Sequence, residues 1–213
     1  MKKAAVITAD LVASRELDKK EREQLFKAIR SALKKMVKEK WIDAFELYRG
    51  DSFQCVLPQK ELALRTALLL RTYVRSYNIL GKQDLKLSIG IGSLDFYRAD
   101  NIAQSDGQAF WLSGTELDNM KKSLYRMSLK TPDPQFNENI EPSILLLDAV
   151  MQKWTGNQAE VIYHKLQSLK EEEISRIIGI SQSAVNQRIH TAQWFAVDKL
   201  LTYFEKNVTK AIV

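Results

Sequence analysis

Two aspartates stand where a β-sheet would bring their carboxylates together. Asp10 ends the first apolar run, at residues 4–9, and Asp51 lies in a tight turn between two further apolar runs, at 44–48 and 53–57. Two such runs around a turn predict a β-hairpin with an acid at its tip. If the first run is a neighbouring strand, both carboxylates reach one edge of the sheet. Two hard oxygen ligands at one edge would suit Mg²⁺ that carries a nucleotide phosphate.

A structural role is the alternative for both acids. Aspartate is common in turns, and Asp10 could cap a helix that begins near Leu17. Spacing alone slightly favours this alternative.

Composition narrows the class of protein. A chain of 213 residues with 45% hydrophobic side chains can build one domain of usual size and a smaller one. The single cysteine, Cys55, excludes a disulfide framework and a Cys/His zinc cluster. Asp10 interrupts the N-terminal apolar run, and Arg65 and Arg71 interrupt the run at 63–70, so no signal peptide or transmembrane span is predicted. We therefore expect a cytoplasmic protein with no membrane partner.

The charge is unevenly distributed. The net charge is +6, and residues 142–213 hold 8 Lys/Arg against 7 Asp/Glu. A basic excess suits a polyanionic partner, but it lies mostly in the N-terminal part of this chain.

Hydrophobic periodicity predicts an α+β fold for the N-terminal part. The expected order is strand, helix, hairpin, helix and strand, with a short loop at 10–15 between the first two elements. This order gives a sheet covered by helices on one face, with one right-handed crossover. The expected elements are a strand at 3–10, a helix at 18–40, a helix at 59–80, a strand at 85–92, a further helix from 105 to 120 and a late strand at 124–129.

A domain boundary is expected at residues 132–142. The stretch 131–142 holds three of the four prolines and a polar run, which is typical of a linker. Residues 1–131 would form the α/β domain, and residues 143–213 an all-helical domain. Its expected helices, at 143–155, 157–168, 170–178 and 182–204, are short and would need to form a bundle.

Residues 171–189 carry a helix-turn-helix pattern. Gly179 permits a left-handed turn residue, and Ser181 can cap the second helix. The alternative is a helical hairpin in a bundle whose outward polar residues are only solvated. The glycine, the helix cap and the apolar spacing together favour DNA binding. The near-neutral charge predicts modest non-specific affinity, with specificity from dimerisation or from a basic face of the first domain. The candidate DNA-binding side chains are Gln182, Ser183, Asn186, Gln187 and Arg188.

Residues 143–201 resemble the region-4-like DNA-binding domain of sigma factors and related response-regulator output domains. In that family the helix that would begin near Gln182 enters the major groove. The resemblance implies the recognition role for the same five residues.

Residues 5–15 and 48–54 resemble the paired signatures of class III nucleotidyl cyclases. With residues 105–114 and the helix-turn-helix tail, the whole chain is similar to the SatD family of small bacterial proteins. The resemblance implies a ferredoxin-like, palm-like sandwich in which Asp10 and Asp51 bind metal. It also implies that a loop cradles phosphate and that arginines pair with it, so the candidate nucleotide-binding residues are Leu11, Val12, Ala13, Ser14, Arg15, Arg49 and Gly50.

The sequence departs from the cyclase pattern at two places. Trp111 stands near the position of an asparagine that stabilises the transferring phosphate, with no arginine nearby, and Ala13 replaces a loop glycine. Catalytic turnover is therefore left open.

Three functions are compatible with these residues. The preferred one is a transcription regulator whose first domain senses a nucleotide with Mg²⁺. The second is an active nucleotidyltransferase or cyclase that acts on a nucleoside triphosphate with Mg²⁺. The third is a DNA-binding protein that uses a degenerate palm-like domain to form a homodimer.

Overall fold

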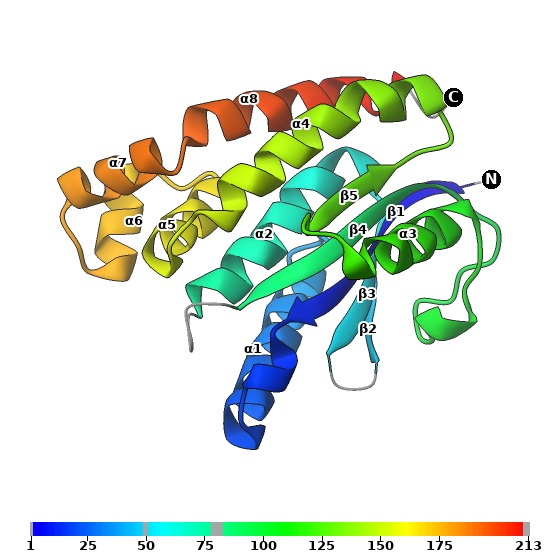
Figure 1. Ribbon diagram of the computed structural model, residues 1–213, viewed down its shortest axis with the longest axis horizontal. Helices are drawn as coiled ribbons and strands as arrows, with labels where there is room; N and C mark the ends of the chain where they lie inside the picture. The colour runs from blue at the N-terminus through cyan, green and yellow to red at the C-terminus, as the bar shows by residue number, and fades with distance from the viewer. Residues whose placement is uncertain (1, 49–50, 78–82, 211–213) are drawn as a thin grey trace.

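The computed structural model describes residues 2–48, 51–77 and 83–210 (Figure 1). Within these ranges one mixed sheet has the strand order β2-β3-β1-β4-β5, in which the first four strands are antiparallel to their neighbours and β5 is parallel to β4. The α+β class predicted from the sequence is confirmed. The strands are β1 (Lys2–Val12), β2 (Ala44–Tyr48), β3 (Ser52–Leu57), β4 (Asp84–Leu94) and β5 (Met127–Lys130).

Helices cover both faces of the sheet, whereas the sequence analysis placed them on one face. Helices α1 (Lys19–Lys38) and α2 (Ala63–Ser76) pack on one side, and α3 (Gln108–Asn119) packs on the other. The reason is visible in β1, whose residues are apolar on both sides: Ile7 joins the core under α2, and Val6 joins the core under α3. A continuous apolar run is typical of a strand that is buried on both faces.

The C-terminal part is helical, but the predicted linker at 132–142 is wrong. Helix α4 (Pro134–Gln152) begins inside it, because the Asp133 carboxylate caps the backbone N–H groups of Gln135 and Phe136. Pro134 occupies the first turn, where the missing N–H has no intrahelical acceptor. The remaining helices are α5 (Gly156–Leu166), α6 (Glu171–Ile178), α7 (Gln182–Thr191) and α8 (Trp194–Asn207). Short 3-10 turns lie at Ser14–Glu16, Lys60–Leu62, Ile102–Gln104 and Met120–Lys122.

The long helix predicted at 182–204 is divided into α7 and α8. Gln193 adopts a left-handed backbone conformation with φ of 58°. The indole N–H of Trp154 donates to the carbonyl oxygen of Ala192 at 3.0 Å, which fixes the break. None of the helices in the described ranges is long and apolar enough to cross a lipid bilayer.

The hydrophobic core continues from the sheet into the C-terminal helices. The cluster that contains Ile7 of β1 and Leu68 of α2 also contains Leu147 of α4 and Leu201 of α8. The division of the chain into two domains stays a prediction.

A buried ionic cluster ties these parts together. The Arg71 guanidinium of α2, with no exposed surface, binds Asp84 at the start of β4 and Asp148 of α4, with closest distances of 2.7 and 2.6 Å. Arg75 and Arg126 also contact Asp84, each at 3.0 Å. Helix α4 is thus anchored to the sheet through charge as well as apolar packing.

Candidate functional site

Asp10 and Asp51 lie at the same end of the two neighbouring strands β1 and β3. Asp10 stands opposite Ser52, and the backbone N–H of Leu11 donates to the carbonyl oxygen of Asp51 at 2.8 Å. Neighbouring strands are about 4.8 Å apart, so the backbones of Asp10 and Asp51 lie close together at this end of the two strands. We call this end of β1 and β3 the acidic rim.

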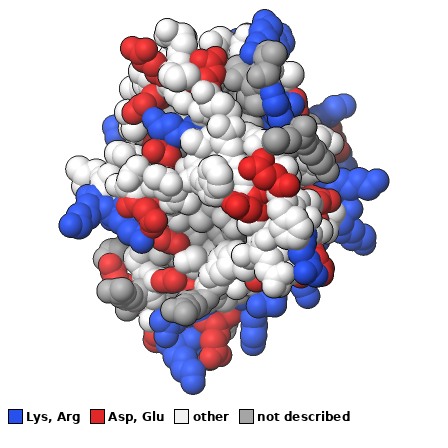
Figure 2. All heavy atoms as spheres, turned by 90° about the vertical axis from the view of Figure 1, so that its right-hand side faces the viewer, with Lys and Arg blue, Asp and Glu red and all other residues white. Residues whose placement is uncertain are grey.

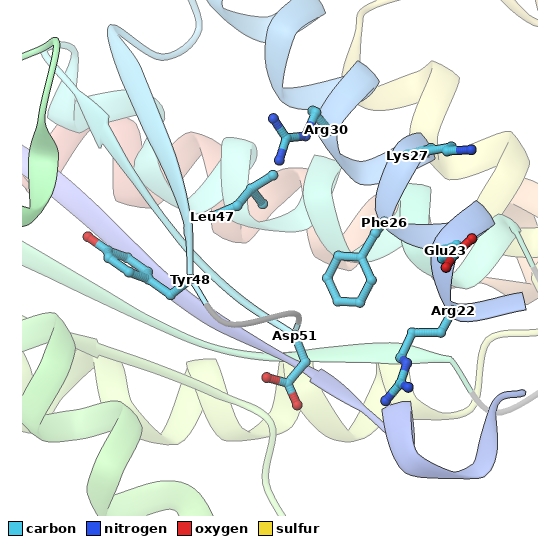
Figure 3. A pocket seen from close by; sticks show the side chains of 8 residues that line it. All are labelled: Arg22, Glu23, Phe26, Lys27, Arg30, Leu47, Tyr48 and Asp51. Atoms are coloured by element: carbon cyan, nitrogen blue, oxygen red, sulfur yellow. The ribbon is translucent and has the colours of Figure 1, made fainter. Parts of the chain in front are cut away.

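The two carboxylates reach the acidic rim from different sides of the sheet. Asp10 follows Thr8 by two residues in β1 and so shares its side, where the Thr8 hydroxyl donates to Ser113 of α3 at 2.9 Å. Asp51 accepts a hydrogen bond from the Ser14 hydroxyl at 3.2 Å and lies at the edge of a cavity on the α1 side of the sheet (Figure 3). A cation held by both would lie at the rim, where the strands end, and not over either face.

The predicted loop at 10–15 is shorter than expected. Leu11 and Val12 belong to β1 and pair with Leu85 and Asp84 of β4, so they lie in a strand and not in a loop, and their contact with phosphate stays a prediction. The turn begins at Ala13, which has φ of 59° and ψ of 24° and precedes the 3-10 turn at Ser14–Glu16. A left-handed residue next to a helical one directs successive backbone N–H groups to one side, as in anion-binding nests. The side chain of Arg15, and both Arg49 and Gly50, lie outside the described residues.

Glycine at position 13 should stabilise the protein. A left-handed conformation costs an alanine about 1 kcal/mol relative to glycine, so Ala13→Gly should raise the free energy of unfolding by about that amount in urea titration. Ala149→Gly, at an exposed position in α4, is the matched control and should lower it by about 1 kcal/mol. A loss of stability in Ala13→Gly would contradict the left-handed turn.

A cavity of about 590 Å³ lies between α1 and the β2–β3 hairpin, with Asp51 at its edge (Figure 3). Arg22, Phe26 and Arg30 follow one another at intervals of four residues in α1, so they lie on the same face of the helix, and all three line the cavity. Basic side chains outnumber acidic ones in the lining. This cavity was not predicted from the sequence, although that spacing was a signal for it. The full lining is Arg22, Glu23, Phe26, Lys27, Arg30, Leu47, Tyr48 and Asp51.

Lys86 is a second feature that the sequence analysis missed. It stands opposite Asp10 in the β1–β4 register, and its ammonium donates to the carbonyl oxygens of Met120 at 2.6 Å and Ser123 at 3.1 Å. Burial lowers the pKa of Lys86, as does the positive charge of Arg126, and the attraction of Asp10 offsets this only in part. Lys86 therefore supplies positive charge beside one acid of the rim.

Asp10 and Asp51 would need a cation that brings further ligands of its own. Across residues 2–48, 51–77 and 83–210, no group of three or more His, Cys, Asp or Glu side chains is placed to hold a metal ion. Mg²⁺ is commonly bound by one or two carboxylates together with substrate phosphates and water. Asp10 and Asp51 would supply the carboxylates of such a site.

The α6–α7 pair has the geometry of two helices around a tight turn. Gly179 is left-handed with φ of 70°, the Ser181 hydroxyl accepts from the N–H of Ala184 at 3.2 Å, and Val185 packs on Ile174 and Val161. Of the five candidate DNA-binding residues, Gln182, Ser183, Asn186 and Gln187 are exposed and Arg188 is partly buried.

Acidic neighbours engage two of these side chains. The Asn186 amide donates to the Glu171 carboxylate at 3.3 Å, and the Arg188 guanidinium lies 3.9 Å from the Glu160 carboxylate. Elsewhere, the face at the right-hand side of Figure 1 has Lys/Arg and Asp/Glu interspersed, with no single basic patch (Figure 2). On that face, which lies away from α6 and α7, charge gives no indication of a nucleic-acid partner.

Fold and site together define an α+β protein with an acidic sheet rim and appended helices. Residues 4–197 match the SatD family, and the chain belongs to that family. A solved structure described as that of a bacterial light-regulated adenylyl cyclase is similar, with 13% sequence identity, a TM-score of 0.42 and coverage of 60% of this chain and 74% of that chain. Comparison with curated proteins gives no significant match.

Proposed function

We propose that the protein is a DNA-binding transcription regulator that senses a nucleotide bound with Mg²⁺ at the acidic rim. The observation that carries the proposal is the position of Asp10 and Asp51 at one end of neighbouring strands, which they approach from different sides of the sheet, beside a cavity lined by three basic and two acidic side chains. Their two carboxylates leave coordination positions for phosphate oxygens. The cavity volume of about 590 Å³ is in the range of small-molecule sites.

The strand order supports this reading. The first four strands and α1 and α2 follow β-α-β-β-α-β with the order β2-β3-β1-β4, which is the ferredoxin-like arrangement. The resemblance of residues 5–15 and 48–54 to nucleotidyl cyclase signatures assigns metal binding to the same two acids. Arg22 and Arg30, in the cavity lining, would pair with phosphate oxygens.

The ligand half of the proposal is tested by calorimetry. Titration of the folded chain with ATP, GTP and their deoxy forms in the presence of Mg²⁺ should give saturable heat for at least one of them. Asp51→Asn should weaken that binding by about 10- to 100-fold, because it removes one charged ligand of the cation. Asp100→Asn, at an exposed aspartate paired with Arg98, is the matched control and should bind as the wild type does. Absence of heat with all four nucleotides would remove the sensor, and a cyclised or transferred product would establish the enzymatic alternative.

The DNA half rests on the exposed polar face of α7. Gln187 is exposed there, at the position expected to meet base edges. Selection of bound fragments from genomic DNA, with and without the nucleotide, should yield a shared sequence whose affinity changes with the ligand, since a ligand regulates only if it favours one state. Gln187→Ala should weaken specific binding by about tenfold, in the range of one base contact. An unchanged footprint would place recognition elsewhere or exclude DNA as the partner.

A further inference from the structure

Helices α4 and α8 run antiparallel along the upper edge of the molecule in Figure 1. A groove of about 210 Å³ lies between them. Its lining is predominantly apolar and comes from both helices: Ser143, Leu146, Leu147, Val150, Gln193, Ala196, Val197 and Leu200.

Large apolar side chains stand exposed on both sides of this groove. Leu146 of α4 is 70% exposed and Phe195 of α8 is 76% exposed. Leu145 and Tyr203 are also exposed, on the same two helices. Several large exposed apolar side chains on two neighbouring helices are typical of a protein–protein contact, whereas single exposed apolar residues are ordinary.

The N-terminal half of α4 and the C-terminal end of α8 carry exposed side chains of opposite charge. Glu138 is exposed in the N-terminal half of α4, and Lys206 is exposed near the end of α8. Neither has an ion-pair partner within the part of the chain that the structure describes. Because the helices are antiparallel, the end of α4 that carries Glu138 lies beside the end of α8 that carries Lys206 (Figure 1), and Leu146 and Ala196 line the same groove.

We propose that this face binds a second copy of the chain. A two-fold axis parallel to the groove would place α4 of one protomer on α8 of its partner, and the reverse. Leu146 would then meet Phe195 of the other copy, and Glu138 would meet Lys206. The surface thus offers its copy matching apolar positions and one pair of opposite charges, as an isologous interface requires, and the Lys199 ammonium lies 5.5 Å from the centre of the Phe195 ring beside this contact.

The dimer goes beyond the proposed function and does not depend on it. Helix α8 follows α7 after two residues, so pairing through α8 would fix the separation of the two α7 helices. Two-fold DNA-binding proteins set their half-site spacing in this way. The test uses the protein without DNA or nucleotide, so its outcome does not depend on whether the protein binds either of them.

Sedimentation equilibrium of the full chain at up to about 100 μM, where complexes with micromolar Kd are populated, should give twice the mass of one chain. Leu146→Asp should raise the dimer Kd by about 10- to 100-fold, since it buries an unpaired charge at the centre of the contact. Ile177→Asp is the matched control, because Ile177 of α6 is 57% exposed away from the groove, and it should leave the Kd unchanged.

Exchange of the two charges between Glu138 and Lys206 tests whether these two residues meet in the dimer. Glu138→Lys and Lys206→Glu should each weaken the dimer, and the double variant should return to within about threefold of the wild type, as expected for directly coupled residues. All four residues changed in these tests are exposed, and circular dichroism would verify folding. A monomeric wild type would overturn the proposal and leave the groove to a different protein, and a dimer unaffected by Leu146→Asp and by both charge reversals would overturn it as well.

Discussion

Arg71→Met is expected to lower the free energy of unfolding by about 3–5 kcal/mol, the cost of breaking a buried ion pair from one side. Arg71 makes two hydrogen bonds to Asp84, at 3.0 and 2.7 Å, and one to Asp148 at 2.6 Å. Without it, Asp148 loses its cationic partner while its carboxylate stays buried, which is costly for a charged group. Urea titration of the variant, followed by far-UV circular dichroism, gives the difference directly.

The matched control is Arg98→Met. Arg98 pairs with Asp100 at 2.8 Å, but both side chains are exposed. Exposed ion pairs contribute little because water and salt screen them, so the unfolding midpoint should stay within experimental error. An equal loss in the two variants would mean that the buried position of Arg71 is irrelevant.

The pH dependence gives a second readout of the cluster. Burial would raise the pKa of Asp84, but the Arg71 charge and hydrogen bonds, together with Arg75 and Arg126, more than offset burial, so the pKa lies below the ordinary aspartate value. A depressed folded-state pKa contributes stability that is present above the unfolded value of about 3.9 and lost as the pH falls through the folded one. Removal of Arg71 removes the largest lowering influence, so the variant should lose less stability than the wild type between about pH 5 and pH 3.

Local patterns in the sequence were sufficient for most elements of the sheet. The apolar run at 4–9 and the turn before Ser52 predicted β1 and the β2–β3 hairpin because strand periodicity and turn chemistry are local properties. The prolines at 132–142 suggested a linker, but Pro134 lies in the first turn of α4 and Pro142 is tolerated inside that helix. Pro134 removes no intrahelical hydrogen bond, whereas Pro142 removes one without ending the helix.

The parts of the site that depend on packing were not predictable in the same way. Lys86 lies opposite Asp10 only because β4 pairs with β1 in a particular register, which no local pattern specifies. Asp148 meets Arg71 only because α4 docks on the sheet. The two rim acids were found from the apolar runs and the turn around them, and the resemblance then favoured metal binding over a structural role. Their approach from different sides of the sheet could not be predicted in this way, because it depends on how the strands pair.

Gly90→Ala is expected to lower the free energy of unfolding by about 3 kcal/mol, at the upper end for overpacking. A methyl group there would lie 2.2 Å from the carbonyl oxygen of Ala109 and 2.4 Å from the backbone nitrogen of Ser113. Both atoms belong to the α3 backbone, so no side chain can move aside and the helix itself must shift. The hydrogen bond from Thr8 to Ser113 would then be strained or lost.

Gly114→Ala is the matched control for this prediction. Gly114 lies in the same helix, and an added methyl group meets nothing within 4 Å. Alanine should therefore stabilise α3 by about 0.5–1 kcal/mol through its higher helix propensity. Both variants are measured by urea titration, and equal signs would contradict the close contact of α3 with β4. A displaced α3 would also move the Met120 carbonyl that binds Lys86, so Gly90→Ala should weaken any ligand at the acidic rim while Gly114→Ala leaves its affinity unchanged.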